Sequence, residues 1–238
     1  NYRFIPHPFL IYFNFLCNSV VLPKKRMPEK KEQKIIVVLP LDKSDKTLII
    51  NGIKIASIFK KELCLLYNYS TKQKKVLPHL KSRLLQYTLP IKKEVTNLKI
   101  STLLLHEKPA HLAERLSDEM EAILIVSPSS AFSKYSRALS ESPVPFLFIP
   151  ENNNSIPEYR QLILPLDLRK ANSDSVLWSS YFGRFAHSHI NIIAANDKSK
   201  EAKTQVAKNV VLTTKLLKKF HINHKVFKGS KSSLNNAW

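Results

Sequence analysis

The five residues Val38-Leu39-Pro40-Leu41-Asp42 recur 125 residues later as Ile163-Leu164-Pro165-Leu166-Asp167. In both places an apolar run ends in an acidic residue and leads into a segment with helical periodicity. The distance between the copies matches the size of one small domain. A repeat of this kind predicts that one domain type occurs twice in the chain.

Short apolar runs alternate with helical segments along the first copy. The strands that we expect there are Ile35–Leu41, Glu62–Tyr69, Leu98–Leu105, Ala122–Val126 and Pro145–Ile149. The helices that we expect between them are 44–61, 76–94, 108–116 and 133–140, with Pro78 and Pro90 breaking the ends of the second one. Such alternation is typical of a parallel sheet with right-handed crossovers. The predicted fold class is therefore α/β, with two tandem open, Rossmann-like parallel-sheet domains.

The expected domains are 34–150 and 160–238, joined by a linker at 151–159. The second domain offers three strands, Gln161–Leu166, Ile190–Ala195 and Asn223–Phe227, so we expect it to be incomplete. Residues 1–33 form an extension whose apolar run Phe9–Leu22 precedes the basic cluster Lys24-Lys25-Arg26. We interpret Met27 as the natural start and residues 1–26 as an upstream translation artefact. The alternative is a membrane anchor with its basic flank in the cytoplasm.

The chain is strongly basic, with a formal net charge of +20, and its 38 basic residues are mainly lysine. Two interpretations stay open: lysine-rich faces that are only solvated, and a nucleic-acid footprint along Lys198–Lys231. The two cysteines, Cys17 and Cys64, cannot build a disulfide framework, which favours a reducing, cytoplasmic location. We expect Cys64 to be a buried small hydrophobe.

No catalytic centre is evident, because no nucleophile has a base placed beside it. Histidines occur in close pairs, but a zinc site needs three or four ligands and no third is evident. We therefore expect no enzyme activity and no metal. These paired histidines are His106 with His111, His187 with His189, and His221 with His224.

The order and spacing of these segments resemble the universal stress protein (UspA-like) family in its tandem form. Ile36–Asp42 resembles its opening strand with Pro-x-Asp, and Glu62–Tyr67 resembles its second strand. Ala122–Val126 resembles the fourth strand, and Ser142–Ile149 resembles the Pro-x-Pro-hydrophobic final strand. The resemblance covers Lys34–Pro150 and, in outline, Arg160–Phe227. It implies an adenine-nucleotide α-hydrolase-like fold. In the family's strand order, loss of the fourth and fifth strands would leave Gln161–Leu166 as an exposed apolar edge.

This family contains ATP binders and non-binders, and the binders carry a glycine-rich loop after the fourth strand. Glycine is needed there because a backbone without Cβ atoms lets successive N–H groups wrap around phosphates. This chain has no glycine between Gly52 and Gly183 and instead continues Ser127-Pro128-Ser129-Ser130-Ala131-Phe132-Ser133-Lys134. The degenerate nucleotide-binding residues that the resemblance leaves are Asp42, Ser127, Ser129, Ser130, Ser133 and Lys134, with Asp167 as the equivalent of Asp42 in the second copy. Both aspartates have an alternative role in capping the following helix.

The resemblance implies a stress-response protein, and the missing glycines predict the type that binds no ATP and acts through protein contacts or self-association. One alternative is a nucleotide sensor with ATP as cofactor, which would use Asp42 and the Ser127–Lys134 loop. Another is a nucleic-acid-associated basic protein. We expect no membrane partner.

Overall fold

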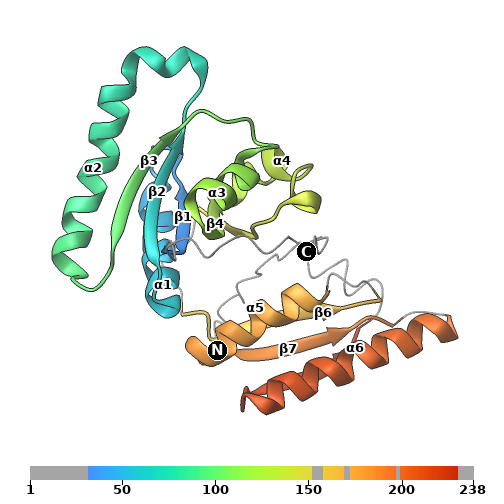
Figure 1. Ribbon diagram of the computed structural model, residues 1–238. Coiled ribbons are helices and arrows are strands. Elements are labelled where there is room, and N and C mark those ends of the chain that lie inside the picture. The colour runs from blue at the N-terminus through green and yellow to red at the C-terminus, as the bar shows by residue number, and fades with distance from the viewer. Residues whose placement is uncertain (1–31, 152–157, 169–171, 197–198, 230–238) are drawn as a thin grey trace, which may run out of the picture. The chain divides into compact units, whose positions relative to one another are not determined.

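The computed structural model describes residues 32–151, 158–168, 172–196 and 199–229, which form two compact units on either side of residues 152–157 (Figure 1). The interpretations of residues 1–26, of Met27 and of the chain after residue 229 lie outside these described residues. No helix in the described ranges is both long and apolar enough to cross a bilayer.

The first unit is a five-stranded parallel sheet in the order β3-β2-β1-β4-β5. Its elements along the chain are β1 (Lys34–Val38), α1 (Asp45–Phe59), β2 (Glu62–Asn68), α2 (Leu77–Glu94), β3 (Ile100–Leu105), α3 (Leu112–Met120), β4 (Ala122–Pro128), α4 (Phe132–Tyr135) and β5 (Phe146–Ile149). Strand β1 lies at the centre, between β2 and β4. It is a continuous apolar run because both of its faces are covered by helices.

The two faces of the first sheet are covered by different helices. Ile36 and Val38 of β1 belong to a core that also contains Leu112 and Leu116 of α3. The side chain of Val37 points to the opposite face, where a Cβ atom placed on Gly52 of α1 would lie 2.4 Å from its Cγ2 atom. Helix α1 therefore packs closely against the face of β1 that carries Val37, opposite the face covered by α3. Cys64 of β2 is fully buried, as predicted, and burial raises the pKa of its thiol to about 11.

The predicted strands agree with the structure to within three residues at each end. Helix α3, predicted over 108–116, instead runs from Leu112 to Met120. Helix α2 matches the predicted range 76–94 to within one residue, but Pro90 does not break its end, because the helix continues through Pro90 to Glu94. The segment after β4 is a series of short turns rather than one helix over 133–140: it contains a 3-10 turn at Ser129–Ala131, the single-turn helix α4 and a second 3-10 turn at Leu139–Glu141. Helices α1 and α3 are followed by the C-cap residues Lys60 and Glu121, whose φ angles are 52° each.

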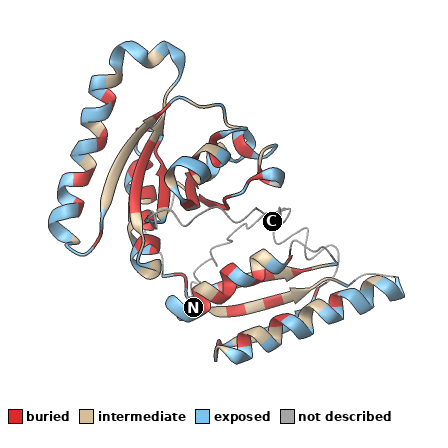
Figure 2. Ribbon diagram, in the orientation of Figure 1, coloured by how far each residue is buried: buried red, intermediate tan, exposed pale blue. Residues whose placement is uncertain are grey.

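The second unit repeats the first part of this pattern. It contains β6 (Gln161–Leu166), α5 (Asn172–Phe185), β7 (His189–Ala194), α6 (Lys200–Lys219) and β8 (His224–Lys228), with parallel strands in the order β6-β7-β8. Because both right-handed crossovers run in the same direction, α5 and α6 lie on one face of the sheet. Leu162, Leu164 and Leu166 of β6 are buried. Buried residues of each unit are drawn in red in Figure 2. As expected, β6 lies at an edge of the sheet formed by the described residues.

Candidate functional site

The carboxyl ends of β1 and β4 are the candidate site in the first unit. Ligands in open parallel sheets bind outside the carboxyl ends of strands, at the point where the strand order reverses. That point lies between β1 and β4, since β2 follows β1 on one side and β5 follows β4 on the other. Of the sequence-predicted residues, Asp42 lies in the loop between β1 and α1, and Ser127–Lys134 covers the last two residues of β4 and the turns that follow it.

The carboxylate of Asp42 accepts hydrogen bonds from its own loop. Its Oδ1 atom accepts hydrogen bonds from the backbone N and the side-chain Oγ of Ser44, at 2.7 and 2.6 Å. The hydrogen bonds from Ser44 hold the pKa of Asp42 below its usual value. Leu41 precedes it with a φ of 61°, so the chain turns sharply between β1 and α1. The carboxylate therefore stabilises the turn that starts α1.

A second aspartate, Asp45, forms a buried polar cluster behind this turn. Its Oδ1 atom accepts a hydrogen bond from the backbone N of Leu41 at 3.0 Å, and its Oδ2 atom accepts one from the hydroxyl of Tyr87 at 2.7 Å. Arg83 donates from Nη2 to the carbonyl oxygen of Leu41 at 2.8 Å. Two residues of α2 thus fix the loop after β1. No pattern in the sequence predicts this cluster.

Burial is the main influence on the ionisation of this cluster. It raises the pKa of Asp45 above the usual value of 3.8, although hydrogen bonds from Tyr87 and Leu41 act in the opposite direction. Burial and the neighbouring Asp45 also raise the pKa of Tyr87. A carboxylate held in this way is part of the scaffold, because its hydrogen-bonding oxygens point at the chain itself.

The loop after β4 offers hydrogen-bond donors, and the chain supplies its own acceptor. Ser129 donates from Oγ to Oε2 of Glu151 at 2.9 Å, and the backbone N of Ser130 donates to Oε1 at 3.3 Å. Burial acts to raise the pKa of Glu151, but hydrogen bonds from Ser130 and Ser129 outweigh it and the pKa is lowered. Glu151 follows β5 and was assigned to the linker by sequence, so its role was missed.

Some of the remaining residues of this segment are exposed to solvent, and others are buried. Ser133 and Lys134 are exposed, and the Nζ atom of Lys134 lies 5.4 Å from the ring centroid of Tyr135. Phe132 packs edge-on against Phe148, with ring centroids 5.1 Å apart. Ser127 is fully buried in β4, and its hydroxyl has no hydrogen-bond partner among the described residues.

Replacing Ser127 by alanine should raise the free energy of unfolding by about 1 kcal/mol, because a buried hydroxyl without a partner carries an uncompensated desolvation cost. Chemical denaturation of both proteins measures the difference. Ser136→Ala, which removes an exposed hydroxyl that donates to the carbonyl of Ser133, is a suitable comparison. A loss of stability in Ser127→Ala would show that the hydroxyl is satisfied in solution.

The second unit fixes its corresponding loop in the same manner. The carbonyl oxygen of Asp167 accepts hydrogen bonds from the side-chain Nδ2 atoms of Asn172 at 2.7 Å and of Asn209 at 2.8 Å. Asn172 begins α5 and Asn209 lies on α6, just as Asp45 begins α1 and Arg83 lies on α2. Each unit thus ties the end of its first strand to its two following helices.

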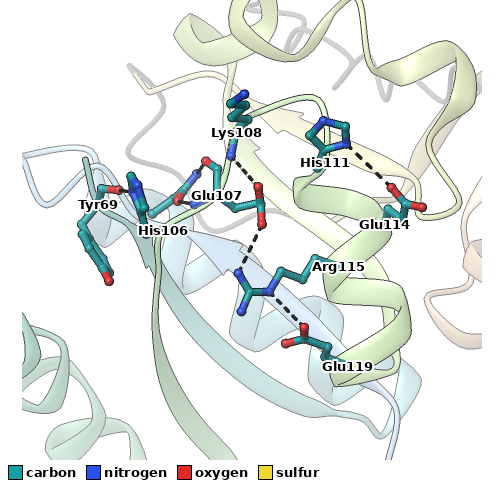
Figure 3. A network of polar contacts seen from close by, with 9 residues as sticks. Tyr69, His106, Glu107, Lys108, His111, Glu114, Arg115 and Glu119 are labelled. Atoms are coloured by element: carbon teal, nitrogen blue, oxygen red, sulfur yellow. Dashed lines mark hydrogen bonds and ion pairs between the residues drawn. The ribbon is translucent and has the colours of Figure 1, made fainter. Parts of the chain in front are cut away.

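A polar network joins the carboxyl ends of β2 and β3 (Figure 3). His106 stacks on Tyr69 and bonds its carbonyl oxygen through Nδ1 at 2.8 Å, while Arg115 bridges Glu107 and Glu119 at 3.2 and 3.1 Å. The guanidinium group of Arg115 pairs with the carboxylates of both Glu107 and Glu119. The network therefore has a structural role, because it links the loop after β3 to α3. Within the described ranges, no group of three or more His, Cys, Asp or Glu side chains is placed to hold a metal ion.

Comparison with known proteins supports the fold. No protein-family model and no curated protein sequence matches the chain. The structure is similar to a universal stress protein from Archaeoglobus fulgidus DSM 4304, with a TM-score of 0.61 and 8% identity over 86% of this chain and 80% of that one. It is also similar to a functionally unknown protein from Pseudomonas aeruginosa PAO1, with a TM-score of 0.52 and 14% identity over 83% and 74% of the chains. At these identities the likeness shows the α/β fold alone.

Proposed function

We propose that the chain is a stress-response protein of the universal stress protein type that binds no ATP, catalyses no reaction and acts through contacts with other proteins. Its fold is shared with a universal stress protein structure. The observation that carries the proposal is the contact of Glu151 with Ser129 and Ser130. The tandem arrangement implied by the sequence repeat is part of the proposal.

Glu151 opposes nucleotide binding in two ways. Its carboxylate accepts the hydrogen bonds that Ser129 and Ser130 would have to donate to a phosphate. It also places a negative charge in the loop, which repels a polyanion. The backbone adds a further obstacle, because Pro128 has no N–H group to donate and the loop contains no glycine. At the other strand end, Ser44 already occupies one carboxylate oxygen of Asp42.

The alternative function is a nucleotide sensor that uses Asp42 and the Ser127–Lys134 loop. Two observations favour it: the hydroxyl of Ser127 lacks a partner among the described residues, and the amino group of Lys134 is exposed. A phosphate that displaced Glu151 would find Ser129, Ser130 and Lys134 within one short segment.

A chain that binds no ATP and catalyses no reaction would act through contacts with other proteins. Strand β6 is suited to self-association, because it lies at an edge of the sheet that the described residues form, and an edge strand presents unpaired backbone N–H and C=O groups. We propose this edge as a site where a second copy or another protein adds a strand.

Calorimetric titration with ATP, with and without magnesium, tests the proposed function. We expect no saturable heat from the wild-type chain, in a sample whose folding is confirmed by circular dichroism. Micromolar binding would overturn the proposal and make the chain a nucleotide sensor.

Glu151→Ala is the informative variant in the same titration. Binding that appears only in this variant would identify Glu151 as the group that excludes phosphate. If neither protein binds, the exclusion of ATP does not depend on Glu151 alone. Glu158→Ala is the matched control, because Glu158 is an exposed glutamate near the same linker that pairs with Arg160.

A further inference from the structure

Two helices hold a large part of the chain's excess positive charge. Helix α2 has four lysine or arginine residues and one glutamate, and the 3-10 turn before it, Thr71–Val76, adds three lysines. Helix α6 has six lysines and one glutamate. The two helices are counterparts in the repeat, since α2 shifted by 125 residues falls on 202–219, inside α6. The same feature therefore occurs once in each unit.

The outer face of α2 combines lysines with exposed leucines. Leu80, Leu84 and Ile91 are buried and define the inner face of the helix. On the outer side, Leu85 and Leu89 are 45% and 69% exposed and are four residues apart. Lysines continue this row at four-residue spacing, with Lys81 before the leucines and Lys93 after them, over about 18 Å of helix. The outer surface of α2 is visible as its pale blue side in Figure 2.

The outer face of α6 has the same composition. Val206, Thr213 and Leu217 are buried, whereas Val211 and Leu212 are 50% and 56% exposed. Lys208 lies four residues before Leu212, and Lys215 lies four residues after Val211. A pair of large apolar side chains is thus flanked by lysines on both helices.

The lysines on these faces carry charge that the protein does not neutralise. Among the described residues, no lysine of α2 or α6 forms an ion pair. The one arginine of α2, Arg83, donates to the carbonyl of Leu41 and helps to fix the loop after β1. The outer faces therefore offer ammonium point charges rather than the planar guanidinium groups that read base edges and bind phosphates in pairs.

We propose that the outer faces of α2 and α6 bind the surface of a membrane rich in anionic lipids. Lysine ammonium groups are attracted to the headgroups, and the exposed leucine and valine side chains enter the boundary of the acyl chains. A nucleic acid would use the charges but would leave the apolar pairs in water. Binding at a surface needs no spanning segment, and this proposal differs from the expectation from the sequence that no membrane is a partner. The inference does not rest on the proposed function.

Co-sedimentation of the full chain with vesicles tests this inference. We expect binding to vesicles of phosphatidylcholine mixed with an equal amount of phosphatidylglycerol, and none to pure phosphatidylcholine. The binding should weaken steeply with added salt, since each lysine near the surface contributes about fivefold to the affinity. No binding to the mixed vesicles at low salt would overturn the inference.

Substitutions of the apolar pairs distinguish a lipid surface from a nucleic acid. The double variant Leu85→Ser/Leu89→Ser should lose about tenfold in vesicle affinity and keep its charge-dependent binding to duplex DNA. The variant Val211→Ser/Leu212→Ser tests α6 in the same way. If the vesicle affinity of both double variants equals that of the wild type and duplex DNA binds more tightly than vesicles, the faces are polyanion sites and the inference is wrong.

The matched control is Leu177→Ser on α5. Leu177 is 43% exposed, close to the value for Leu85, but α5 contains no lysine. Its substitution should leave vesicle binding unchanged. Thermal unfolding of every variant, read by circular dichroism, confirms that the comparison is made between folded proteins.

Discussion

Replacing Gly52 by alanine should destabilise the first unit by about 3 kcal/mol, although glycine-to-alanine changes inside helices usually stabilise them by up to about 1 kcal/mol. The reversal of sign comes from packing. A Cβ atom at residue 52 would lie 2.4 Å from Cγ2 of Val37 and 3.1 Å from Cδ1 of Leu63. Both neighbours belong to central strands, so α1 would have to move away from the sheet.

Urea denaturation of the wild type and of Gly52→Ala measures the effect. Ser57→Ala, at an exposed position of the same helix, is the control for helix propensity and should change the stability little. A double-mutant cycle with Val37→Ala provides a second check, because the smaller side chain makes room for the new methyl group. The double variant should be more stable than the sum of the two single effects predicts, and simple additivity would contradict the packing argument.

Asp45→Ala should cost about 3 kcal/mol at neutral pH, whereas Asp45→Asn should remain within about 1 kcal/mol of the wild type. Alanine leaves the backbone N–H of Leu41 and the hydroxyl of Tyr87 without their acceptor. Asparagine keeps an oxygen for Leu41 and offers an amide group to Tyr87, and it removes a buried charge. Denaturant unfolding of the three proteins measures both differences, and equal losses in the two variants would contradict this account.

The difference in unfolding free energy between the wild type and Asp45→Asn should depend on pH with a defined sign. Burial raises the pKa of Asp45 above 3.8 in the folded state, so the folded chain holds this proton more tightly than the unfolded chain. The stability gained in this way is complete below pH 3.8 and is lost as the pH rises through the folded-state pKa. Asparagine does not titrate. The stability difference should therefore shift in favour of Asp45→Asn as the pH rises above 3.8 and through the folded-state pKa of Asp45.

The strands of both units could be predicted from the sequence because buried parallel strands are continuous apolar runs, as in Ile35–Val38 and Leu162–Leu166. The range of α2 could also be predicted, but its continuity through Pro90 could not, since Pro90 reads as a helix breaker. It lies in the last turns, where the helix loses one hydrogen bond while Leu84 and Ile91 still hold it against the sheet. Tertiary packing thus outweighed the local preference.

The polar contacts of the candidate site were harder to predict than the strands. Asp42 was singled out, but Asp45 with Arg83 and Tyr87 was not, because the two segments are 42 residues apart and only the fold brings them together. Glu151 was placed in a linker, since asparagines and a proline follow it directly. Its contact with Ser129 depends on where β5 ends relative to β4. A sequence pattern gives the order of such segments and not the distance between their ends.

Strand order also governs when each unit can fold during synthesis. In the first unit, β1 pairs with β4, so one side of the central strand stays open until residues 122–128 have left the ribosome. Ordering this pair closes a loop of more than eighty residues, which slows folding and prolongs the exposure of an apolar strand. In the second unit, β6, β7 and β8 pair in chain order, and each new strand adds to the previous one as it emerges. A nascent chain of this protein would thus need protection mainly in its first half.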